Sequence, residues 1–278
     1  MKHNCCANIK LIFFIGLTFL LLSGCKDSNK SIRKIENLKS DDGSFFSCKY
    51  QNSERSFILY TPENKTDQTP LIFMLHGYGS SGEGFRVQTH FDEKALLRGY
   101  AIVYVNGISD PESKTSGTGW NSGLNNSSKD DVGFLCSLTE TLQNDYGFSK
   151  KRTFAVGFSN GAFLIHRLAV ETKTFNALVS VSGFLPKSIW EKRPRKISSA
   201  FLQITGTNDK LIPMNLTGTA KTNPNPAIED VLAYYQKGQK TSEKVQHIII
   251  QHGEHSWPEE KFAGFNVNEK ILDFFDNY

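Results

Sequence analysis

The chain has 278 residues, and its 32 Lys and Arg side chains face 28 Asp and Glu side chains, giving a formal net charge of +4 at pH 7. A charge so close to balance, without a long block of Lys and Arg, gives no footprint for a phosphate backbone, so we expect no nucleic-acid partner. The length suits a single α/β domain behind a short N-terminal segment.

The N-terminal segment has the layout of a secretory signal. Lys2 and Lys10 make its start basic, and residues 11–22 are an almost unbroken apolar run. A basic head followed by about 7–15 apolar residues is typical of an export signal, whereas a membrane-spanning helix needs about 20. We therefore expect residues 1–24 to be a signal peptide. A signal anchor followed by an incidental cysteine is the alternative.

Leu22-Ser23-Gly24-Cys25 resembles the lipobox of bacterial lipoproteins. This resemblance implies cleavage before Cys25 and lipidation of its thiol, so the protein is expected on a membrane of the bacterial cell envelope, outside the cytoplasm. Residues 25–43 are polar and lysine-rich. Because they have too few apolar side chains to form a core, we expect a flexible tether there. We expect residues 44–278 to form one folded domain, which contains all the motifs described below.

Two cysteines remain once Cys25 and the signal peptide are set aside, namely Cys48 and Cys136. Two thiols in an exported protein can form a disulfide, but pairing requires a short Cα separation that a sequence does not reveal, so their state stays open. There is no Cys-x-x-Cys pair and no His/Cys cluster with zinc-ligand spacing. We therefore expect no metal ion.

Segments with the pattern of buried strands alternate with segments of helical periodicity throughout the domain. This alternation predicts an α/β fold with a mostly parallel central sheet and helices on both faces. An antiparallel hairpin in front of such a sheet is typical of the α/β-hydrolase fold. The long polar stretch 107–129 is expected to be a loop, and loops of this length are usually functional. The predicted strands are residues 45–50 and 55–60 (the hairpin), 71–75, 101–105, 153–156, 177–181, 200–205 and 244–250, and the predicted helices are residues 91–98, 132–146, 162–170, 227–237 and 268–275.

A Gly-x-Ser-x-Gly motif occurs at residues 157–161, with Ser159 at its centre. It follows a predicted strand and precedes a predicted helix, which is the setting of a nucleophile elbow. The turn of such an elbow is so sharp that the serine needs small residues on both sides, and glycines provide them. Ser159 is therefore the candidate nucleophile. A glycine-rich structural turn is the alternative.

A nucleophilic serine needs a base and an acid that orients the base, and in this fold the chain order is serine, acid, histidine. Asp209 lies just past the strand predicted at 200–205, where ligand-facing groups of a parallel sheet collect, so it is the candidate acid. The candidate bases are His247, His252 and His255. His247 lies within a predicted strand, and the loop position of His255 favours it over His252.

Two backbone amides are expected to stabilise a developing oxyanion. His76-Gly77-Tyr78-Gly79 follows a predicted strand, at a place where loops of this kind donate an N–H, and Tyr78 is our candidate for that donor. The second N–H is expected from Asn160, the residue after the nucleophile. His76 then shapes the loop and does not act as the base.

Several motifs occur together along the domain. They are HGYGSSGEGF (76–85), VNG (105–107), GW (119–120), DDVGFL (130–135), GFSNGA (157–162), GTND (206–209) followed by Ile212-Pro213, and GEHSWP (253–258). As a set they resemble the polyhydroxybutyrate depolymerase/feruloyl esterase family of secreted α/β hydrolases, from about residue 55 to residue 275. The resemblance implies Ser159, Asp209 and His255 as the catalytic triad, and it selects His255 over His252 through the HSWP match. It also implies ester hydrolysis without a cofactor.

We therefore expect a lipid-anchored serine esterase. The resemblance implies feruloyl or acetyl esters on plant polysaccharide, or polyhydroxyalkanoate-type esters, as substrates. Trp120 and Trp257 are either flat surfaces for a sugar or aryl group or packing residues at the rim. The sequence departs from some relatives at Val105, where they carry proline, and the 107–129 insert leaves the cleft undefined. A peptidase on the same fold and a non-catalytic glycan-binding surface lipoprotein are the alternative functions.

Overall fold

The computed structural model describes residue 1 and residues 34–278, except residues 111–114, 125–126, 215–224 and 238. The expected signal peptide beyond residue 1, the expected lipidation residue Cys25 and the first part of the expected tether lie outside the described residues. Within the described part of the chain, no helix is long and apolar enough to cross a membrane.

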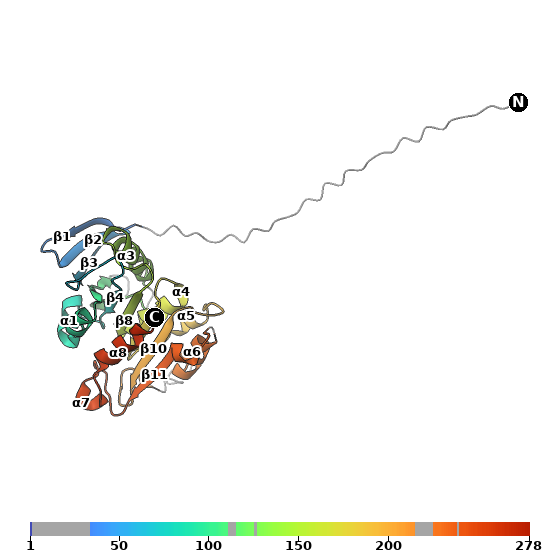
Figure 1. Ribbon diagram of the computed structural model, residues 1–278. Helices are drawn as coiled ribbons and strands as arrows, with labels where there is room; N and C mark the ends of the chain where they lie inside the picture. Colours follow the sequence, from blue (N-terminus) through green and yellow to red (C-terminus); the bar gives the residue numbers. More distant parts are fainter. Residues whose placement is uncertain (2–33, 111–114, 125–126, 215–224, 238) are drawn as a thin grey trace. The chain divides into compact units, whose positions relative to one another are not determined.

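The described residues form a nine-stranded central sheet with the order β1-β2-β3-β5-β4-β8-β9-β10-β11 (Figure 1). The strands from β5 to β11 in this order run parallel, whereas β1, β2 and β3 are antiparallel to their neighbours. This is the α/β-hydrolase fold that the sequence predicts, including the hairpin of β2 and β3. The strands are β1 Glu36–Ser40, β2 Phe45–Tyr50, β3 Ser53–Tyr60, β4 Leu71–Leu75, β5 Ala101–Val105, β8 Thr153–Phe158, β9 Ala177–Val181, β10 Ala200–Gly206 and β11 Val245–Ile250.

Helices cover both faces of the sheet. One buried cluster contains side chains of α3, α4 and α6, and a second contains side chains of α1, α2 and α8. The helices are α1 Gly82–Thr89, α2 Phe91–Leu97, α3 Asp131–Asp145, α4 Asn160–Glu171, α5 Lys187–Trp190, α6 Ile228–Gln236, α7 Glu260–Ala263 and α8 Val267–Asp276, and a short 3₁₀ turn, η2, spans Ser242–Lys244.

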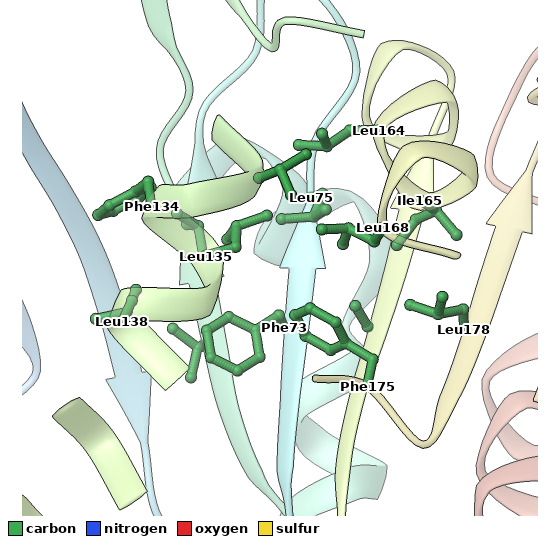
Figure 2. Packing of buried hydrophobic residues seen from close by; sticks show 14 of the residues in the cluster. Phe73, Leu75, Phe134, Leu135, Leu138, Leu164, Ile165, Leu168, Phe175 and Leu178 are labelled. Carbon is green, nitrogen blue, oxygen red and sulfur yellow. The ribbon is translucent and has the colours of Figure 1, made fainter. Parts of the chain in front are cut away.

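Strand β4 shows why the central strands are apolar without interruption. Every residue of β4 is buried, and successive side chains point to opposite faces. Phe73 and Leu75 join the α3 and α4 side of the core, as Figure 2 shows, while Ile72 and Met74 join the other side. The carboxyl end of β4 therefore lies in a rigid two-sided core, and the loop that begins at His76 starts from a fixed point.

The N-terminal strand β1 corrects the sequence analysis. Residues 36–40 were expected in the flexible tether 25–43, but they pair antiparallel with β2, with Ser40 opposite Phe46. An edge strand needs only one neighbour for its backbone hydrogen bonds and can keep polar side chains in solvent. Leu38 packs against the core from this strand. The tether prediction is therefore wrong from residue 36 onward.

The polar stretch 107–129 also contains structure that its composition did not predict. β6 (Ile108–Asp110) and β7 (Thr115–Gly119) form a separate two-stranded antiparallel sheet, in which Ile108 faces Gly119. Short strands of Ser, Thr and Gly carry no apolar alternation, so the sequence indicated a loop here. We call β6 and β7 together the insert hairpin.

The two cysteines of the domain are not paired. Cys48 and Cys136 both carry free thiols. Burial raises the pKa of the Cys48 thiol to about 11, which keeps it protonated. The Thr174 hydroxyl donates to Sγ of Cys136 at 3.2 Å. Cys48 and Cys136 therefore do not form a disulfide, which settles the pairing that the sequence left open.

Candidate active site

Ser159 stands in a sharp turn between β8 and α4. Its φ and ψ angles are 52° and −116°. Residues other than glycine rarely adopt this backbone conformation, and those that do are often found at functional sites. A Cβ on Gly157 would lie 2.4 Å from the carbonyl oxygen of Gly161, and a Cβ on Gly161 would lie 2.2 Å from the carbonyl oxygen of Leu75. Only glycine fits at either position, which is the physical basis of the Gly-x-Ser-x-Gly spacing.

The structure brings Ser159, His255 and Asp209 together. Nε2 of His255 lies 2.9 Å from Oγ of Ser159, and Nδ1 of His255 lies 2.8 Å from Oδ2 of Asp209. With the proton on Nδ1, the imidazole donates to the carboxylate and accepts the serine O–H. In this geometry the imidazole can take the serine proton.

The other two candidate histidines lie elsewhere. His252 is exposed in a turn with φ at 61°, and its backbone amide donates to Oγ1 of Thr207. His247 lies in β11, where its Nε2 is 2.7 Å from Oγ1 of Thr205 and burial lowers its pKa. Of the three histidines, only His255 contacts Ser159.

Asp209 is held as a carboxylate although it is almost fully buried. Burial opposes its ionisation, but hydrogen bonds from His255 and from the Ile212 amide outweigh this effect and keep the pKa of Asp209 below its usual value. Oδ1 accepts the amides of Leu211 at 3.0 Å and Ile212 at 2.8 Å, while Oδ2 faces His255. The carboxylate is therefore charged and oriented toward the imidazole.

Trp257 fastens the loop that carries His255. It is only 7% exposed, and its Nε1 donates to Oδ1 of Asn268 at 3.1 Å. Its ring meets Phe85 edge-on, with centroids 5.4 Å apart. A ring covered in this way has no free face for a sugar or aryl group. The prediction of Trp257 as a substrate surface is wrong, and the packing alternative is correct.

The same correction applies to Trp120. Its ring is 4% exposed and lies 5.1 Å from that of His76, and its Nε1 donates to the carbonyl oxygen of His76 at 2.8 Å. Trp120 is therefore buried against the loop after β4 and presents no flat surface. Tyr78, in contrast, is 51% exposed on that loop. The sequence analysis assigned Tyr78 only a backbone role and missed its exposed ring.

The two expected oxyanion donors flank the nucleophile. A Cβ on Gly77 would lie 3.4 Å from Cβ of Ser159, so the loop with Tyr78 runs directly beside the serine. Asn160 is the first residue of α4, where a backbone amide has no partner within the helix. Neither the Tyr78 amide nor the Asn160 amide has an acceptor among the described residues. Both N–H groups are available to an oxygen atom beside Ser159.

His76 shapes this loop, as the sequence predicts. Its Nδ1–H donates to the carbonyl oxygen of Gly77 at 2.7 Å, and its Nε2 accepts the amide of Gly107 at 2.9 Å. Burial lowers the pKa of His76, so the ring stays neutral and can do both. The ring thereby connects the loop after β4 to the start of the insert hairpin.

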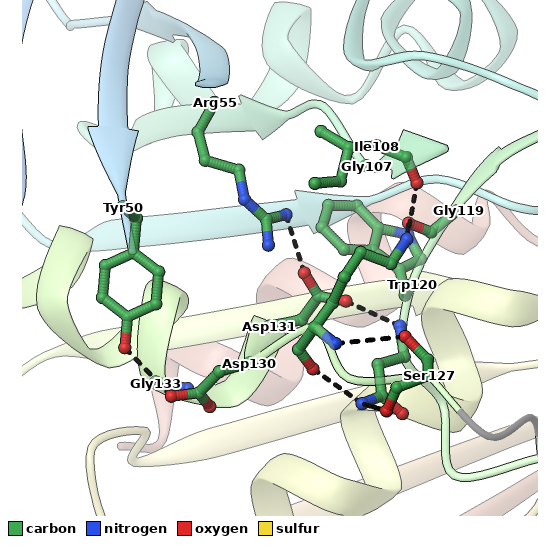
Figure 3. A network of polar contacts seen from close by, with 12 residues as sticks. Tyr50, Arg55, Gly107, Ile108, Gly119, Trp120, Ser127, Asp130, Asp131 and Gly133 are labelled. Atoms are coloured by element: carbon green, nitrogen blue, oxygen red, sulfur yellow. Dashed lines mark hydrogen bonds and ion pairs between the residues drawn. The ribbon is translucent and has the colours of Figure 1, made fainter. Parts of the chain in front are cut away.

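A polar network that the sequence analysis missed ties the insert to the domain (Figure 3). Nη1 of Arg55 lies 2.7 Å from Oδ1 of Asp131 in a buried ion pair, although the two groups lack hydrogen-bond alignment. Oδ2 of Asp131 accepts the Asn121 amide at 2.6 Å, and Nζ of Lys129 donates to the carbonyl oxygen of Ile108 at 2.6 Å. The Lys129 bond joins the two ends of the insert to each other, and the Asn121 bond ties the insert to the buried Asp131.

A cavity of about 300 Å³ lies beside the histidine loop. It is lined by the ends of β9, β10 and β11 and by residues on both sides of His255, including Glu254 and Ser256. Ser159 and His255 do not line it, so the cavity flanks the site and does not contain it. No group of three or more His, Cys, Asp or Glu side chains that could hold a metal ion occurs in the part of the chain that the structure describes.

Comparison with known proteins identifies the family. The family described as Phospholipase/Carboxylesterase matches residues 58–252, a segment that includes Ser159 and Asp209 and ends before His255. The chain belongs to this family. This is a family of carboxylesterase-type hydrolases with the α/β-hydrolase fold.

The chain is similar to three curated esterases over somewhat more than half of its length. It is 30% identical over 165 residues to the putative esterase NocK of Nocardia uniformis, covering 57% of this chain and 45% of NocK. It is 28% identical over 173 residues to feruloyl esterase C of Emericella nidulans, covering 59% and 58%. It is 24% identical over 163 residues to the bifunctional acetylxylan esterase/xylanase XynS20E of Neocallimastix patriciarum, covering 58% and 22%. The matched part is less than two thirds of each relative.

Solved structures show the same fold. An acetyl xylan esterase from Aspergillus awamori superposes with a TM-score of 0.56 at 15% identity, over 81% of this chain and 94% of that one. A dienelactone hydrolase from Anabaena variabilis superposes with a TM-score of 0.56 at 19% identity, over 84% and 95%. At such identities, the similarity shows the α/β-hydrolase fold alone.

Proposed function

We propose that this carboxylesterase-type hydrolase cleaves carboxylic esters through a covalent acyl-enzyme on Ser159. The observation that carries the proposal is the pair of contacts from Ser159 Oγ to His255 Nε2 at 2.9 Å and from His255 Nδ1 to Asp209 Oδ2 at 2.8 Å. A serine hydroxyl is a weak nucleophile until a base within hydrogen-bond reach takes its proton. A binding module has no need of this arrangement.

In the proposed reaction, Oγ of Ser159 attacks the ester carbonyl carbon while Nε2 of His255 takes the serine proton. The negative Asp209 stabilises the imidazolium that forms. The carbonyl oxygen becomes an oxyanion and accepts the amides of Tyr78 and Asn160. His255 then gives its proton to the leaving alcohol, and it acts as base again when water attacks the acyl-enzyme.

Labelling with a fluorophosphonate probe tests the nucleophile. The wild-type protein should be labelled at Ser159, since the probe traps a serine that has an adjacent base. Ser159→Ala should lose both labelling and the hydrolysis of p-nitrophenyl acetate. Absence of labelling in the folded wild-type protein would contradict the proposal and favour a non-catalytic glycan-binding protein.

The proposed substrates are feruloyl or acetyl esters on plant polysaccharide, or polyhydroxyalkanoate-type esters. Support comes from the names of the feruloyl and acetylxylan esterases to which the chain is similar, and from the resemblance of its motif set to the polyhydroxybutyrate depolymerase/feruloyl esterase family. Acetylated xylan, feruloylated arabinoxylan, a hydroxybutyrate oligomer and a peptide, assayed side by side, distinguish these classes. Cleavage of the peptide alone would contradict the esterase proposal and indicate a peptidase.

We further propose that the protein is exported and held on a bacterial membrane by a lipid on Cys25. Support comes from the apolar run at residues 11–22 and from the lipobox-like sequence that ends at Cys25. The full-length chain should incorporate labelled palmitate and enter the detergent phase on phase separation, and Cys25→Ser should do neither. Equal incorporation by Cys25→Ser would contradict lipidation at this residue.

A further inference from the structure

The insert hairpin and the residue after it lie against the loop that carries the expected oxyanion donor Tyr78. The Gly79 amide donates to the carbonyl oxygen of Thr118 at 2.8 Å, and the Thr118 hydroxyl donates to the carbonyl oxygen of Ser80 at 2.6 Å. The Gly117 amide donates to the Tyr78 hydroxyl at 2.7 Å. Three consecutive residues of the loop are therefore bonded to two adjacent residues of β7.

Trp120, directly after β7, extends these contacts to the second expected donor. Its backbone amide donates to Oδ1 of Asn160 at 2.7 Å, and its Nε1 donates to the carbonyl oxygen of His76 at 2.8 Å. The segment 117–120 thus holds the residues on both sides of the position where the oxyanion would form. We call this segment the clamp.

The glycines of the clamp allow the close approach. A Cβ on Gly119 would lie 2.8 Å from Oδ1 of Asn160 and 3.1 Å from Cδ2 of Tyr78. A Cβ on Gly117 would lie 2.7 Å from Cζ of Tyr78. Neither glycine has a positive φ angle. What requires glycine here is therefore contact with the two donor residues and not backbone conformation.

The clamp is itself fixed to the body of the domain. Nζ of Lys129 contacts the carbonyl oxygens of Ile108 and Gly119, at 2.6 Å and 3.4 Å. Directly after the clamp, the Asn121 amide donates to Asp131, whose other oxygen contacts Arg55 (Figure 3). The clamp is therefore fixed relative to the buried core, and its hydrogen bonds fix the loop after β4 in turn.

We propose that residues 117–120 are a positioning element that fixes the distance between the Tyr78 and Asn160 amides. The proposal rests on the proposed acyl-enzyme reaction. Donors stabilise an oxyanion best when they are held in place before the charge develops. If the loop must first become ordered, the free-energy cost of ordering it reduces the net stabilisation of the transition state. Loosening the clamp should weaken binding of the transition state and leave ground-state binding of the ester unchanged.

Thr118→Val and Gly119→Ala test this role. Thr118→Val keeps the shape of the side chain but removes the donor to Ser80, and Gly119→Ala pushes on Asn160 and Tyr78. Each should lower kcat by about 10-fold, less than the effect of deleting an oxyanion donor outright, with KM unchanged. The inhibition constant of phenylboronic acid, whose adduct with serine is tetrahedral and anionic, should rise by the same factor. Thr118→Ser, which keeps the hydroxyl, should restore kcat.

Ser109→Ala is the matched control, because Ser109 pairs with Thr118 in the same hairpin but is exposed, and its side chain makes no hydrogen bond to the described residues of the loop after β4. Its kcat and inhibition constant should equal those of the wild type. The melting temperature of each variant shows whether a loss of kcat comes from a positioning defect or from unfolding. If Gly119→Ala does not fold, the comparison of Thr118→Val with Thr118→Ser still tests the proposal.

Two results would overturn the clamp alone while the wild type remains labelled by the fluorophosphonate. The first is that folded Thr118→Val has the kcat and inhibition constant of the wild type. The second is that KM rises while kcat stays constant. If the wild type were neither labelled by the fluorophosphonate nor inhibited by phenylboronic acid, the proposed reaction would be wrong. The proposed role of the clamp would then be wrong as well.

Discussion

Nη1 of Arg55 in β3 lies 2.7 Å from Oδ1 of Asp131 at the start of α3, and both side chains are almost completely buried. The guanidinium also stacks over Phe134, 4.7 Å from the ring centroid. Desolvation of either charge alone is costly, so each group is stable in the core only while the other is present. The ion pair joins the N-terminal antiparallel strands, α3 and the insert at a single point.

Asp131→Ala should lower the free energy of unfolding by about 3–5 kcal/mol, because it leaves the Arg55 guanidinium buried without a partner. The double variant Arg55→Met/Asp131→Leu removes both charges and should be more stable than Asp131→Ala. Denaturant unfolding followed by circular dichroism measures both. A single variant that unfolds at the wild-type denaturant concentration would show that the pair contributes no stability.

His255→Ala and His252→Ala form a matched pair for the base. Only His255 contacts Ser159, so His255→Ala should lose about 10⁶-fold in kcat, the loss seen when the histidine of a comparable triad is removed. His252→Ala, three residues earlier and exposed, should keep the wild-type kcat. Hydrolysis of p-nitrophenyl acetate provides the measurement. The opposite ranking of the two variants would assign the base to His252.

Trp257→Phe tests the corrected role of this side chain. The substitution keeps most of the packing against Phe85 but leaves Oδ1 of Asn268 without its donor, which should lower the free energy of unfolding by about 1–3 kcal/mol. The ratio of KM for a phenyl ester to KM for a methyl ester should not change, because the buried ring contacts no substrate. A selective rise in KM for the phenyl ester would restore Trp257 as a substrate-binding residue.

The fold was predictable where burial alone decides the residue type. The strands at 71–75, 101–105 and 177–181 have the predicted boundaries because a strand covered on both faces must be apolar throughout. Helix α1 was not predicted, since Gly82 and Gly84 have low helix propensity and the helix is stabilised by capping from Ser81 and by burial of Phe85. Strand β1 was missed because pairing of its backbone leaves no apolar pattern in its side chains.

The candidate site was predictable where chain order and turn chemistry constrain it. The elbow at Ser159 requires glycines on both sides, and this requirement is visible in the sequence. The burial of Trp120 and Trp257 was not visible, because a tryptophan in a loop can face solvent or the core with equal local sequence. The contacts of the clamp join residues that are far apart in the chain, such as Thr118 and Ser80, so no local sequence pattern predicts them.

His166 provides a test of the core that is independent of the reaction. It lies on α4, fully surrounded by protein, where its Nε2–H donates to Oε1 of Gln203 at 3.2 Å and its Nδ1 accepts the Tyr235 hydroxyl at 2.9 Å. Burial lowers the pKa of His166 from 6.5 to about 3, although the bond to Gln203 opposes this. The folded protein therefore keeps His166 neutral at a pH where the unfolded chain protonates it.

Because the unfolded state binds the extra proton, His166 should make stability fall as the pH falls below about 6.5, by about 2 kcal/mol at pH 5, and the loss should level off near pH 3. His166→Gln has no titrating group at this position. Burial also lowers the pKa values of His76 and His247, but both residues are present in the two proteins, so their effects cancel in the difference. The unfolding free energy of the wild type minus that of His166→Gln should therefore be about 2 kcal/mol lower at pH 5 than at pH 7. A difference that stays constant over this range would mean that His166 takes up its proton in the folded state as readily as in the unfolded one.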